Sequence, residues 1–246
     1  MKTDSTFILI VLVLVLATHI IVRAASAEDI DDIAERAKAA PASGNTHESV
    51  QILTEHISRA PSAALYFQRG VAYAAKNMVD SAMKDFDKAI SMDDTQPSYY
   101  FKRGVTRYRQ GDFPNALHDL GATIDLEPTN LNAVAYRARV LFKLHRPAKA
   151  LADLLTAIEK SPNSSALHRL KGDILSANGN FQEAVKDYDR AIELGASDAA
   201  VYNNRSVALA NLGKVNQAME DILRTMEVVE SPRSSLKPSP FAGSPW

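Results

Sequence analysis

The side chains that most often carry out chemistry in proteins are dispersed in this sequence. The chain of 246 residues has six histidines and no cysteine, which excludes disulfides, thiolate metal sites and cysteine nucleophiles. It contains no His-Glu-x-x-His pair, no glycine-rich phosphate loop, no dinucleotide fingerprint and no Gly-x-Ser-x-Gly elbow. The sequence therefore predicts no enzyme, no catalytic residues, no metal site and no cofactor.

The overall charge is close to balance. The formal net charge is -1 at pH 7, with 46% apolar and 23% charged residues, as in an ordinary globular protein. Such a chain has no strong field that would attract nucleic acid, and neither nucleic acid nor a small-molecule substrate is expected as a partner.

One pattern of charges is regular. A basic residue recurs along the chain, and an aspartate follows each one sixteen residues later. The basic residues are Arg69, Arg103, Arg137, Lys171 and Arg205, and the aspartates are Asp85, Asp119, Asp153, Asp187 and Asp221. One reading is a row of cations for an acidic ligand, and the other is a ladder of ion pairs between helices. Because both signs recur together, the pattern favours the ladder.

The elements that position these charges repeat every 34 residues. Residues that stand 34 positions apart form columns of similar side chains. One column holds small residues, namely Gly70, Gly104, Ala138, Gly172 and Ser206. A second column is all alanine, namely Ala82, Ala116, Ala150, Ala184 and Ala218. A third holds large side chains, namely Phe86, Leu120, Leu154, Tyr188 and Ile222. Columns in phase over five units indicate tandem helical repeats.

The pattern resembles the tetratricopeptide repeat (TPR) family. Its first clear unit begins at Ala63, and later units begin near Pro97, Leu131, Ser165 and Ala199. The resemblance implies an all-α, right-handed solenoid of antiparallel helix pairs, with five clear repeats over residues 63–230. Residues 29–61 are predicted to form a degenerate first repeat that caps the stack.

The columns have physical reasons. The small residue and the alanine are predicted where two helices cross closely, and the large side chain fills the space beside them. The turn between the two helices of each unit is predicted at Asn77, Gly111, His145, Gly179 and Gly213. Glycine and asparagine tolerate the left-handed conformation that ends a helix, and histidine does so less readily.

The family resemblance also implies a binding surface, because the first helices of such repeats line a concave groove that holds protein segments. The family's groove positions correspond here to Phe67, Phe101, Lys102, Tyr108, Arg109, Arg139, Phe142, Lys143 and Arg169. Asp173 is an acid among them, and Asn203, Asn204 and Asn211 are polar members. Aromatic side chains beside arginines suit a protein or peptide partner that carries acidic groups. The alternative is that the aromatics belong to the helix stack and the cations only solvate one face.

Residues 1–27 are predicted to be a signal peptide. An apolar run over residues 7–22 is followed by Ala25-Ser26-Ala27, the small-x-small pattern of a cleavage site. The expected location is exported, either periplasmic or in the secretory lumen or outside the cell. The alternative is a membrane anchor at residues 7–22, but a helix of that length spans only about 24 Å, short of the roughly 30 Å hydrocarbon layer.

The other end of the chain lacks the polar-faced helix that usually closes such a stack. The last repeat, with Met219, Leu223 and Met226 in its second helix, is followed by a Ser/Pro-rich segment, residues 231–246. That composition predicts a flexible tail. An uncapped last repeat suggests self-association or a partner at this end.

The sequence thus predicts an exported, non-catalytic scaffold or adaptor that binds a protein or peptide segment in its groove. Two alternatives stay open. One is a chaperone-like holdase for unfolded proteins, and the other is a membrane-tethered assembly factor.

Overall fold

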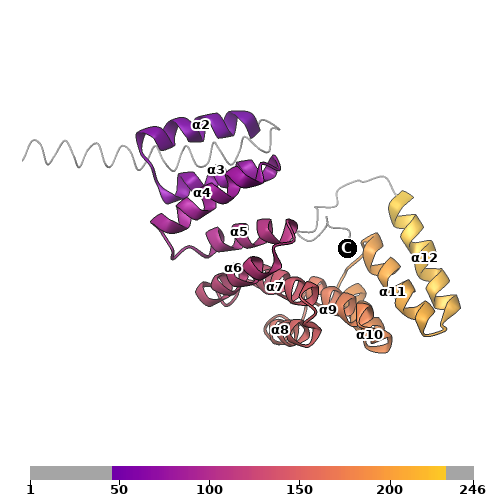
Figure 1. Cartoon of the computed structure of the whole chain (residues 1–246). Coiled ribbons are helices and arrows are strands. Elements are labelled where there is room, and N and C mark those ends of the chain that lie inside the picture. Colours follow the sequence, from indigo (N-terminus) through magenta and orange to yellow (C-terminus); the bar gives the residue numbers. More distant parts are fainter. Residues whose placement is uncertain (1–45, 231–246) are drawn as a thin grey trace, which may run out of the picture. The chain divides into compact units, whose positions relative to one another are not determined.

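A computed structural model of the chain describes residues 46–230, and every regular element in that range is an α-helix (Figure 1). The helices are α2 (Thr46–Arg59), α3 (Ala63–Ala75), α4 (Val79–Met92), α5 (Pro97–Arg109), α6 (Phe113–Leu126), α7 (Leu131–Lys143), α8 (Pro147–Lys160), α9 (Ser165–Ala177), α10 (Phe181–Glu193), α11 (Ala199–Asn211) and α12 (Val215–Glu230). The predicted all-α class is therefore confirmed. The predicted signal peptide, residues 29–45 of the degenerate repeat and the tail lie outside the described residues.

The first helix of each clear repeat, in α3, α5, α7, α9 and α11, begins at the residue that the repeat pattern indicated. Local chemistry explains three of these starts. The side chains of Ser62, Asn130 and Asp198 precede α3, α7 and α11 and accept hydrogen bonds from backbone N–H groups of the first turn. Such caps satisfy donors that have no partner inside the helix.

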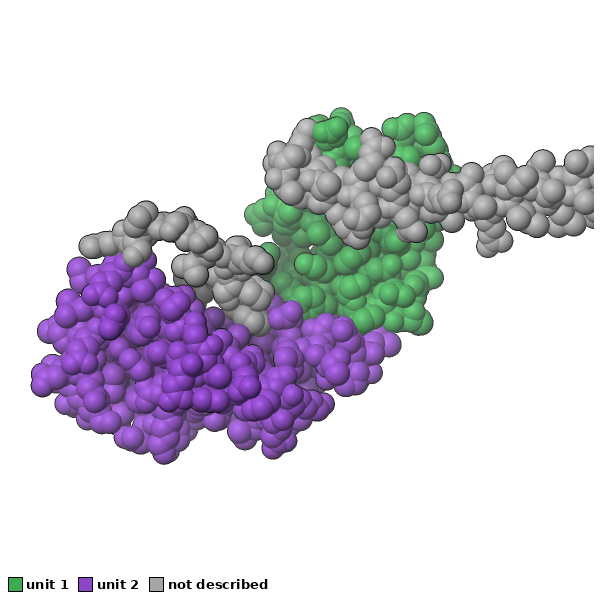
Figure 2. Space-filling model, turned by 180° about the vertical axis from the view of Figure 1, so that it is seen from behind, with its two compact units in different colours: residues 1–110 green, residues 111–246 purple. Residues whose placement is uncertain are grey.

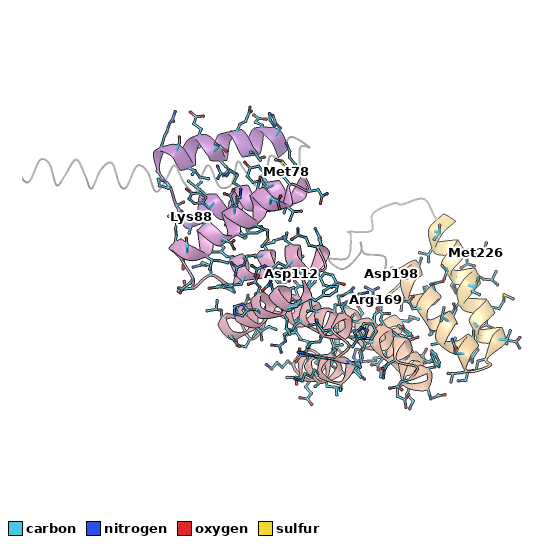
Figure 3. All side chains as sticks on the ribbon, viewed as in Figure 1. Met78, Lys88, Asp112, Arg169, Asp198 and Met226 are labelled. Atoms are coloured by element: carbon cyan, nitrogen blue, oxygen red, sulfur yellow. The ribbon has the colours of Figure 1, made fainter. Side chains whose placement is uncertain are left out.

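The turns inside the five repeats all have the predicted left-handed residue. The φ angles are 58° at Asn77, 80° at Gly111, 57° at His145, 83° at Gly179 and 74° at Gly213. A left-handed residue ends the first helix and reverses the chain within a few residues. After Gly111, Asp112 accepts a hydrogen bond from the backbone N–H of Asn115 and so caps α6 (Figure 3).

The described helices divide into two compact units, coloured separately in Figure 2. Helices α2 to α5 belong to the first unit, which ends at Gln110, and helices α6 to α12 belong to the second, which begins at Gly111. The boundary falls inside the second repeat. Each unit is described by itself below.

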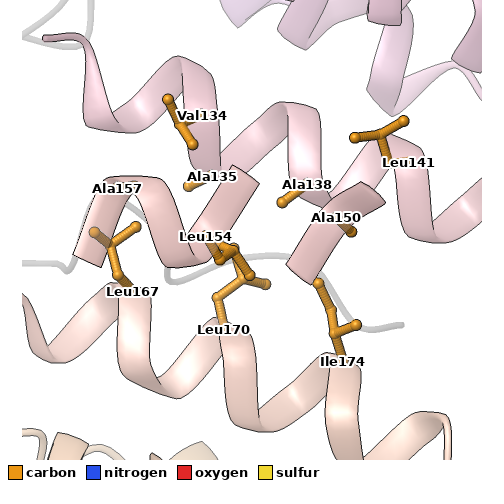
Figure 4. Close-up of a cluster of buried hydrophobic side chains, with 10 residues drawn as sticks. All are labelled: Val134, Ala135, Ala138, Leu141, Ala150, Leu154, Ala157, Leu167, Leu170 and Ile174. Carbon is orange, nitrogen blue, oxygen red and sulfur yellow. The ribbon is translucent and has the colours of Figure 1, made fainter. Parts of the chain in front are cut away.

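The core of the second unit is built from the small and large columns of the repeats. Figure 4 shows a cluster in which side chains from α7, α8 and α9 meet. Its members are Val134, Ala135, Ala138, Leu141, Ala150, Leu154, Ala157, Leu167, Leu170 and Ile174. Leu154 of α8 is fully buried against neighbours from both adjacent helices. The cluster shows why a single repeat is not enough: its second helix is covered by the next repeat.

The close helix crossings explain the glycines. A Cβ atom on Gly70 would lie 2.8 Å from Cε1 of Phe86, and one on Gly172 would lie 2.8 Å from Cε1 of Tyr188. Both distances are too short for carbon atoms, so the aromatic ring of the second helix requires a glycine opposite. In the third repeat, Ala138 fits against the smaller Leu154, and both are fully buried.

The last helix is different from the other second helices. Phe86, Leu120 and Leu154 of the large column are fully buried, whereas Ile222 of α12 is 44% exposed. Other large apolar side chains of α12 are exposed as well, namely Val215, Met219, Leu223, Met226 and Val229. Among the described residues, no later helix covers this face.

Candidate functional site

The regular charges form an ion-pair ladder between the two helices of a repeat. Arg69 donates two hydrogen bonds to Asp85, at 2.7 and 2.8 Å. The same geometry joins Arg137 to Asp153 at 2.7 and 2.9 Å and Arg205 to Asp221 at 2.8 and 2.6 Å. Lys171 Nζ lies 2.8 Å from Asp187. Arg103 and Asp119 belong to different units.

Two of these basic residues also link one repeat to the next. Arg103 of α5 donates to Asp87 of α4 at 2.6 Å, and Arg205 of α11 donates to Asp189 of α10 at 2.7 Å. The hydrogen bonds that Arg205 donates to Asp221 and Asp189 raise the pKa of Arg205 and hold it charged. The ladder reading is confirmed for the four pairs that lie within one unit. These cations already have carboxylate partners and are poor candidates for an acidic ligand.

The first unit carries five of the predicted groove residues. Phe67 of α3 is half-buried, with its ring centroid 4.7 Å from that of Tyr99 and 6.0 Å from that of Phe86. These contacts place Phe67 in the stack between two repeats. Phe101 and Tyr108 of α5 are also half-buried, whereas Lys102 and Arg109 of the same helix are exposed.

The second unit carries the other four predicted residues. Arg139, Phe142 and Lys143 are half-buried on α7, and Arg169 is half-buried on α9. Phe142 packs against the core cluster of Figure 4. Since α7 contacts α9 and α9 contacts α11, these side chains come from a row of adjacent first helices. Arg169 faces the neighbouring helix, with Nη1 4.0 Å from Oδ1 of Asp198 at the start of α11 (Figure 3).

A pocket of about 350 Å³ opens between α9, α10 and α11. It is lined by Asp173, Ser176, Ala177, Phe181, Tyr188, Asn204, Val207 and Asn211, and we call it the Asp173 pocket. Six of its eight residues lie on the first helices α9 and α11. Its volume falls at the lower end of the range of ligand sites, about 300–1,000 Å³.

Hydrogen bonds organise the polar side of the pocket. Asp173 is 4% exposed, and its Oδ1 accepts from the hydroxyl of Tyr188 at 3.0 Å and from Nδ2 of Asn204 at 2.9 Å. Its other oxygen, Oδ2, is buried and has no hydrogen-bond partner among the described residues. A buried acceptor without a donor is uncommon, because it loses its hydrogen bonds to water without replacement.

Burial controls the titration of this pair. Desolvation raises the pKa of Asp173, and the hydrogen bond from Asn204, the charge of Arg169, the hydrogen bond from Tyr188 and the charge of Arg139 oppose that rise. Burial also raises the pKa of Tyr188, and the nearby Asp173 adds to the effect. Tyr188 therefore stays a hydrogen-bond donor at neutral pH.

Sequence reasoning noted Asp173 as a groove acid and Asn204 as a polar groove residue but did not bring them together, and it missed Tyr188. A signal was present, since Tyr188 is the one polar residue in a column that otherwise holds Phe86, Leu120, Leu154 and Ile222. A buried tyrosine hydroxyl needs a hydrogen-bond partner. An acidic residue fifteen positions earlier, beside the small Gly172, supplies it.

The described helices offer neither a metal site nor a membrane span. Within residues 46–230, no group of three or more histidine and acidic side chains is arranged to hold a metal ion. In the same range, no helix has the length and apolar character needed to cross a membrane.

Family comparisons agree with the repeat pattern. A model described as a tetratricopeptide repeat-like domain matches residues 101–214, and a tetratricopeptide repeat model matches residues 63–96. No curated protein matches the sequence.

Similar solved structures have the same fold at low identity. PilF from Pseudomonas aeruginosa has 17% identity and a TM-score of 0.72 over 84% of this chain and 95% of that chain. A tetratricopeptide repeat protein from Parabacteroides merdae has 18% identity and a TM-score of 0.71, with 80% and 79% covered. YrrB, described as a TPR protein with an unusual peptide-binding site, has 20% identity and a TM-score of 0.57, with 73% and 93% covered. Identities this low show a shared fold and nothing more specific.

Proposed function

Because the chain belongs to the tetratricopeptide repeat family, we propose that it is a non-catalytic scaffold or adaptor that binds a protein or peptide segment along the first helices of its repeats. The observation that carries this proposal is the Asp173 pocket, which opens between the adjacent first helices α9 and α11. The description of YrrB as having a peptide-binding site offers a precedent on the same fold.

The second unit supplies the chemistry for such a segment. Arg139, Lys143 and Arg169 place positive charge on α7 and α9, and none of them belongs to the ion-pair ladder. Cations on a partly desolvated surface attract carboxylates and fix the register of a bound chain. The partner segment is accordingly proposed to carry acidic groups.

Affinity capture tests this proposal. The bait is the full chain, expressed in its source cells and purified as it accumulates there, beside an Arg139→Glu/Arg169→Glu variant. The control is Lys160→Glu/Lys186→Glu, which makes the same change in charge at exposed positions of the second helices α8 and α10. We expect one or a few proteins to be captured by the wild type and the control but not by the groove variant. Equal capture by all three would contradict the groove, provided that their thermal unfolding is unchanged.

We further propose that the protein acts in an exported compartment, after removal of residues 1–27. The support is the composition of that segment, which lies outside the described residues. N-terminal sequencing of protein from source cells is expected to begin at Glu28. An intact N-terminus in a membrane fraction would instead favour a membrane-tethered assembly factor.

The exposed face of α12 supports a proposal of self-association through the last repeat. Met219 and Met226 of this helix are each more than half exposed. Sedimentation at micromolar concentration is expected to show a dimer, and Met219→Lys/Met226→Lys is expected to convert it to a monomer. A monomeric wild type would contradict self-association. If the wild type but not the variant also suppressed aggregation of a model unfolded protein, the holdase function would be favoured.

A further inference from the structure

The Asp173 pocket has one polar group whose bonding is incomplete. Both oxygens of a carboxylate accept hydrogen bonds, and a buried carboxylate normally has donors on each. Oδ1 of Asp173 accepts hydrogen bonds from both Tyr188 and Asn204, whereas Oδ2 accepts none from the described residues. These two contacts position the carboxylate of Asp173 in the wall of the pocket.

Two asparagines of the pocket have further acceptors. Asn204 uses its amide nitrogen on Asp173, and Asn211 uses its amide nitrogen on the backbone oxygen of Val207, at 2.8 Å. Each amide therefore has its carbonyl oxygen left as an acceptor at the pocket. Lining residues Ala177, Phe181 and Val207 add apolar surface.

We propose that the Asp173 pocket binds a basic side chain, a lysine or an arginine, of the segment that occupies the groove. An ammonium or guanidinium group has only donors and needs several acceptors, which Asp173, Asn204 and Asn211 offer. The aliphatic stem of such a side chain packs on apolar surface while its charged end reaches the carboxylate. This inference rests on the proposed function, because it names one residue type within the bound segment.

Charges of both signs surround the pocket. Arg169 and Arg139 act on Asp173 through their charges rather than by hydrogen bonds. Arg169 also lies 4.0 Å from Asp198, which offsets part of its charge. A segment that places a basic residue at Asp173 and acidic residues beside it would meet both kinds of charge in this groove.

The opposite ligand, a carboxylate, fits this pocket poorly. It would bring a second anion against the buried oxygen of Asp173, and like charges at such distance strongly disfavour one another. A purely apolar side chain would leave Oδ2 buried and without a donor, which costs the full desolvation of that group. Of these three kinds of side chain, only a basic one brings both a donor for Oδ2 and a charge opposite to that of Asp173.

The test is a selection from a randomised library of 12-residue peptides against the full chain and its Asp173→Asn variant. Asparagine keeps the shape and the acceptor for Tyr188 and Asn204 but removes the charge. The matched control is Asp125→Asn, which makes the same change in charge at an exposed position of α6 that does not line the pocket. Binding of benzylamine and of benzyl alcohol to the same three proteins, followed by the side-chain amide signals of Asn204 and Asn211, gives a second measurement.

We expect the wild type and the control to select peptides that share a lysine or arginine at one place. Asp173→Asn should bind those peptides about tenfold or more weakly, as for the loss of one hydrogen bond to a charged group. Benzylamine should bind more tightly than benzyl alcohol to the wild type and the control but not to Asp173→Asn. The binding of benzylamine should weaken as the pH falls and Asp173 takes up a proton.

The other outcomes separate the two proposals. Selected peptides without a shared basic residue, or with equal affinity for Asp173→Asn, would overturn the basic side chain but leave the peptide-binding function standing. No selected peptide, together with Asp173-dependent benzylamine binding, would overturn the proposed function and keep the pocket as a site for a basic group. No binding of either kind would overturn both.

Discussion

In the first repeat (α3 and α4) and in the fourth repeat (α9 and α10), a glycine of the first helix lies against an aromatic ring of the second helix. The two crossings have the same geometry, since a Cβ atom on Gly70 or Gly172 would lie 2.8 Å from the ring and 3.2 Å from a backbone oxygen of the second helix. The rings differ by one hydroxyl group, because Phe86 stands where the fourth repeat has Tyr188. The residue after the glycine differs too, and Val71 corresponds to Asp173.

This difference shows how a repeat acquires a site without a change of fold. The backbone crossing depends on the glycine and on the ring, and both repeats keep them. A hydroxyl and a carboxylate then join across the crossing in the fourth repeat, and Asn204 from the next first helix completes the group. The first repeat has the apolar Phe86 and Val71 at the corresponding positions, so it has no carboxylate there.

The largest expected effect comes from substituting the glycine that lies against the aromatic ring in both repeats. Gly70→Val and Gly172→Val should each lower the free energy of unfolding by about 3 kcal/mol, because the added side chain meets an aromatic ring. Urea unfolding of the full chain measures this loss. Phe86→Leu should rescue Gly70→Ala in part, because the third repeat combines Ala138 with Leu154. Strict additivity of Gly70→Ala and Phe86→Leu would contradict the steric explanation.

The ladder is the next feature to compare between the two repeats. Asp85→Ala should cost about 2–3 kcal/mol, because it leaves the guanidinium of Arg69 without its two hydrogen bonds to a buried carboxylate. Arg69→Lys should cost only about 1 kcal/mol, since the fourth repeat already uses Lys171 at this position. Equal losses for the two variants would show that the bidentate geometry, rather than the charge, determines stability here.

Exchanging Phe86 and Tyr188 tests whether the hydroxyl group matters to each crossing. Phe86→Tyr should cost about 2 kcal/mol, because the first repeat has Val71 where a buried hydroxyl would need an acceptor. Tyr188→Phe should cost about 1 kcal/mol, because Asp173 keeps its hydrogen bond from Asn204. A stabilised Tyr188→Phe variant would indicate that the hydroxyl is retained for binding and not for the fold. Thermal unfolding of both variants measures these changes.

The smallest expected effect is a dependence on pH. Because burial raises the pKa of Asp173, the folded chain keeps this proton at pH values where the unfolded chain has released it. The contribution of Asp173 to stability therefore falls as the pH rises from about 3.9 to its folded pKa. Asp173→Asn removes that penalty and should be more stable than the wild type at pH 7, with the difference shrinking toward pH 4. A difference that does not change with pH would contradict the raised pKa.

Much of the fold was predictable because each feature of the repeat recurs in five units of the sequence. The start of each first helix, the left-handed turn residues and the ion-pair ladder follow from columns that recur every 34 residues. The column of large side chains predicts burial at Ile222, but this residue is exposed. Its burial depends on a following helix and not on residue type. The predictions for residues 1–45 and 231–246 remain predictions, as do the roles of the groove residues.

The all-α class, the 34-residue period and the partners in the ladder follow from the sequence alone, because they depend on spacing along a helix and on the recurrence of opposite charges. Which of the groove side chains meet one another depends on how the helices pack. Phe67 turned out to stack on Tyr99 between repeats, and Asp173, Tyr188 and Asn204 came together from three helices. Contacts of that kind depend on crossing distances of a few ångströms, and repeat spacing alone does not contain them.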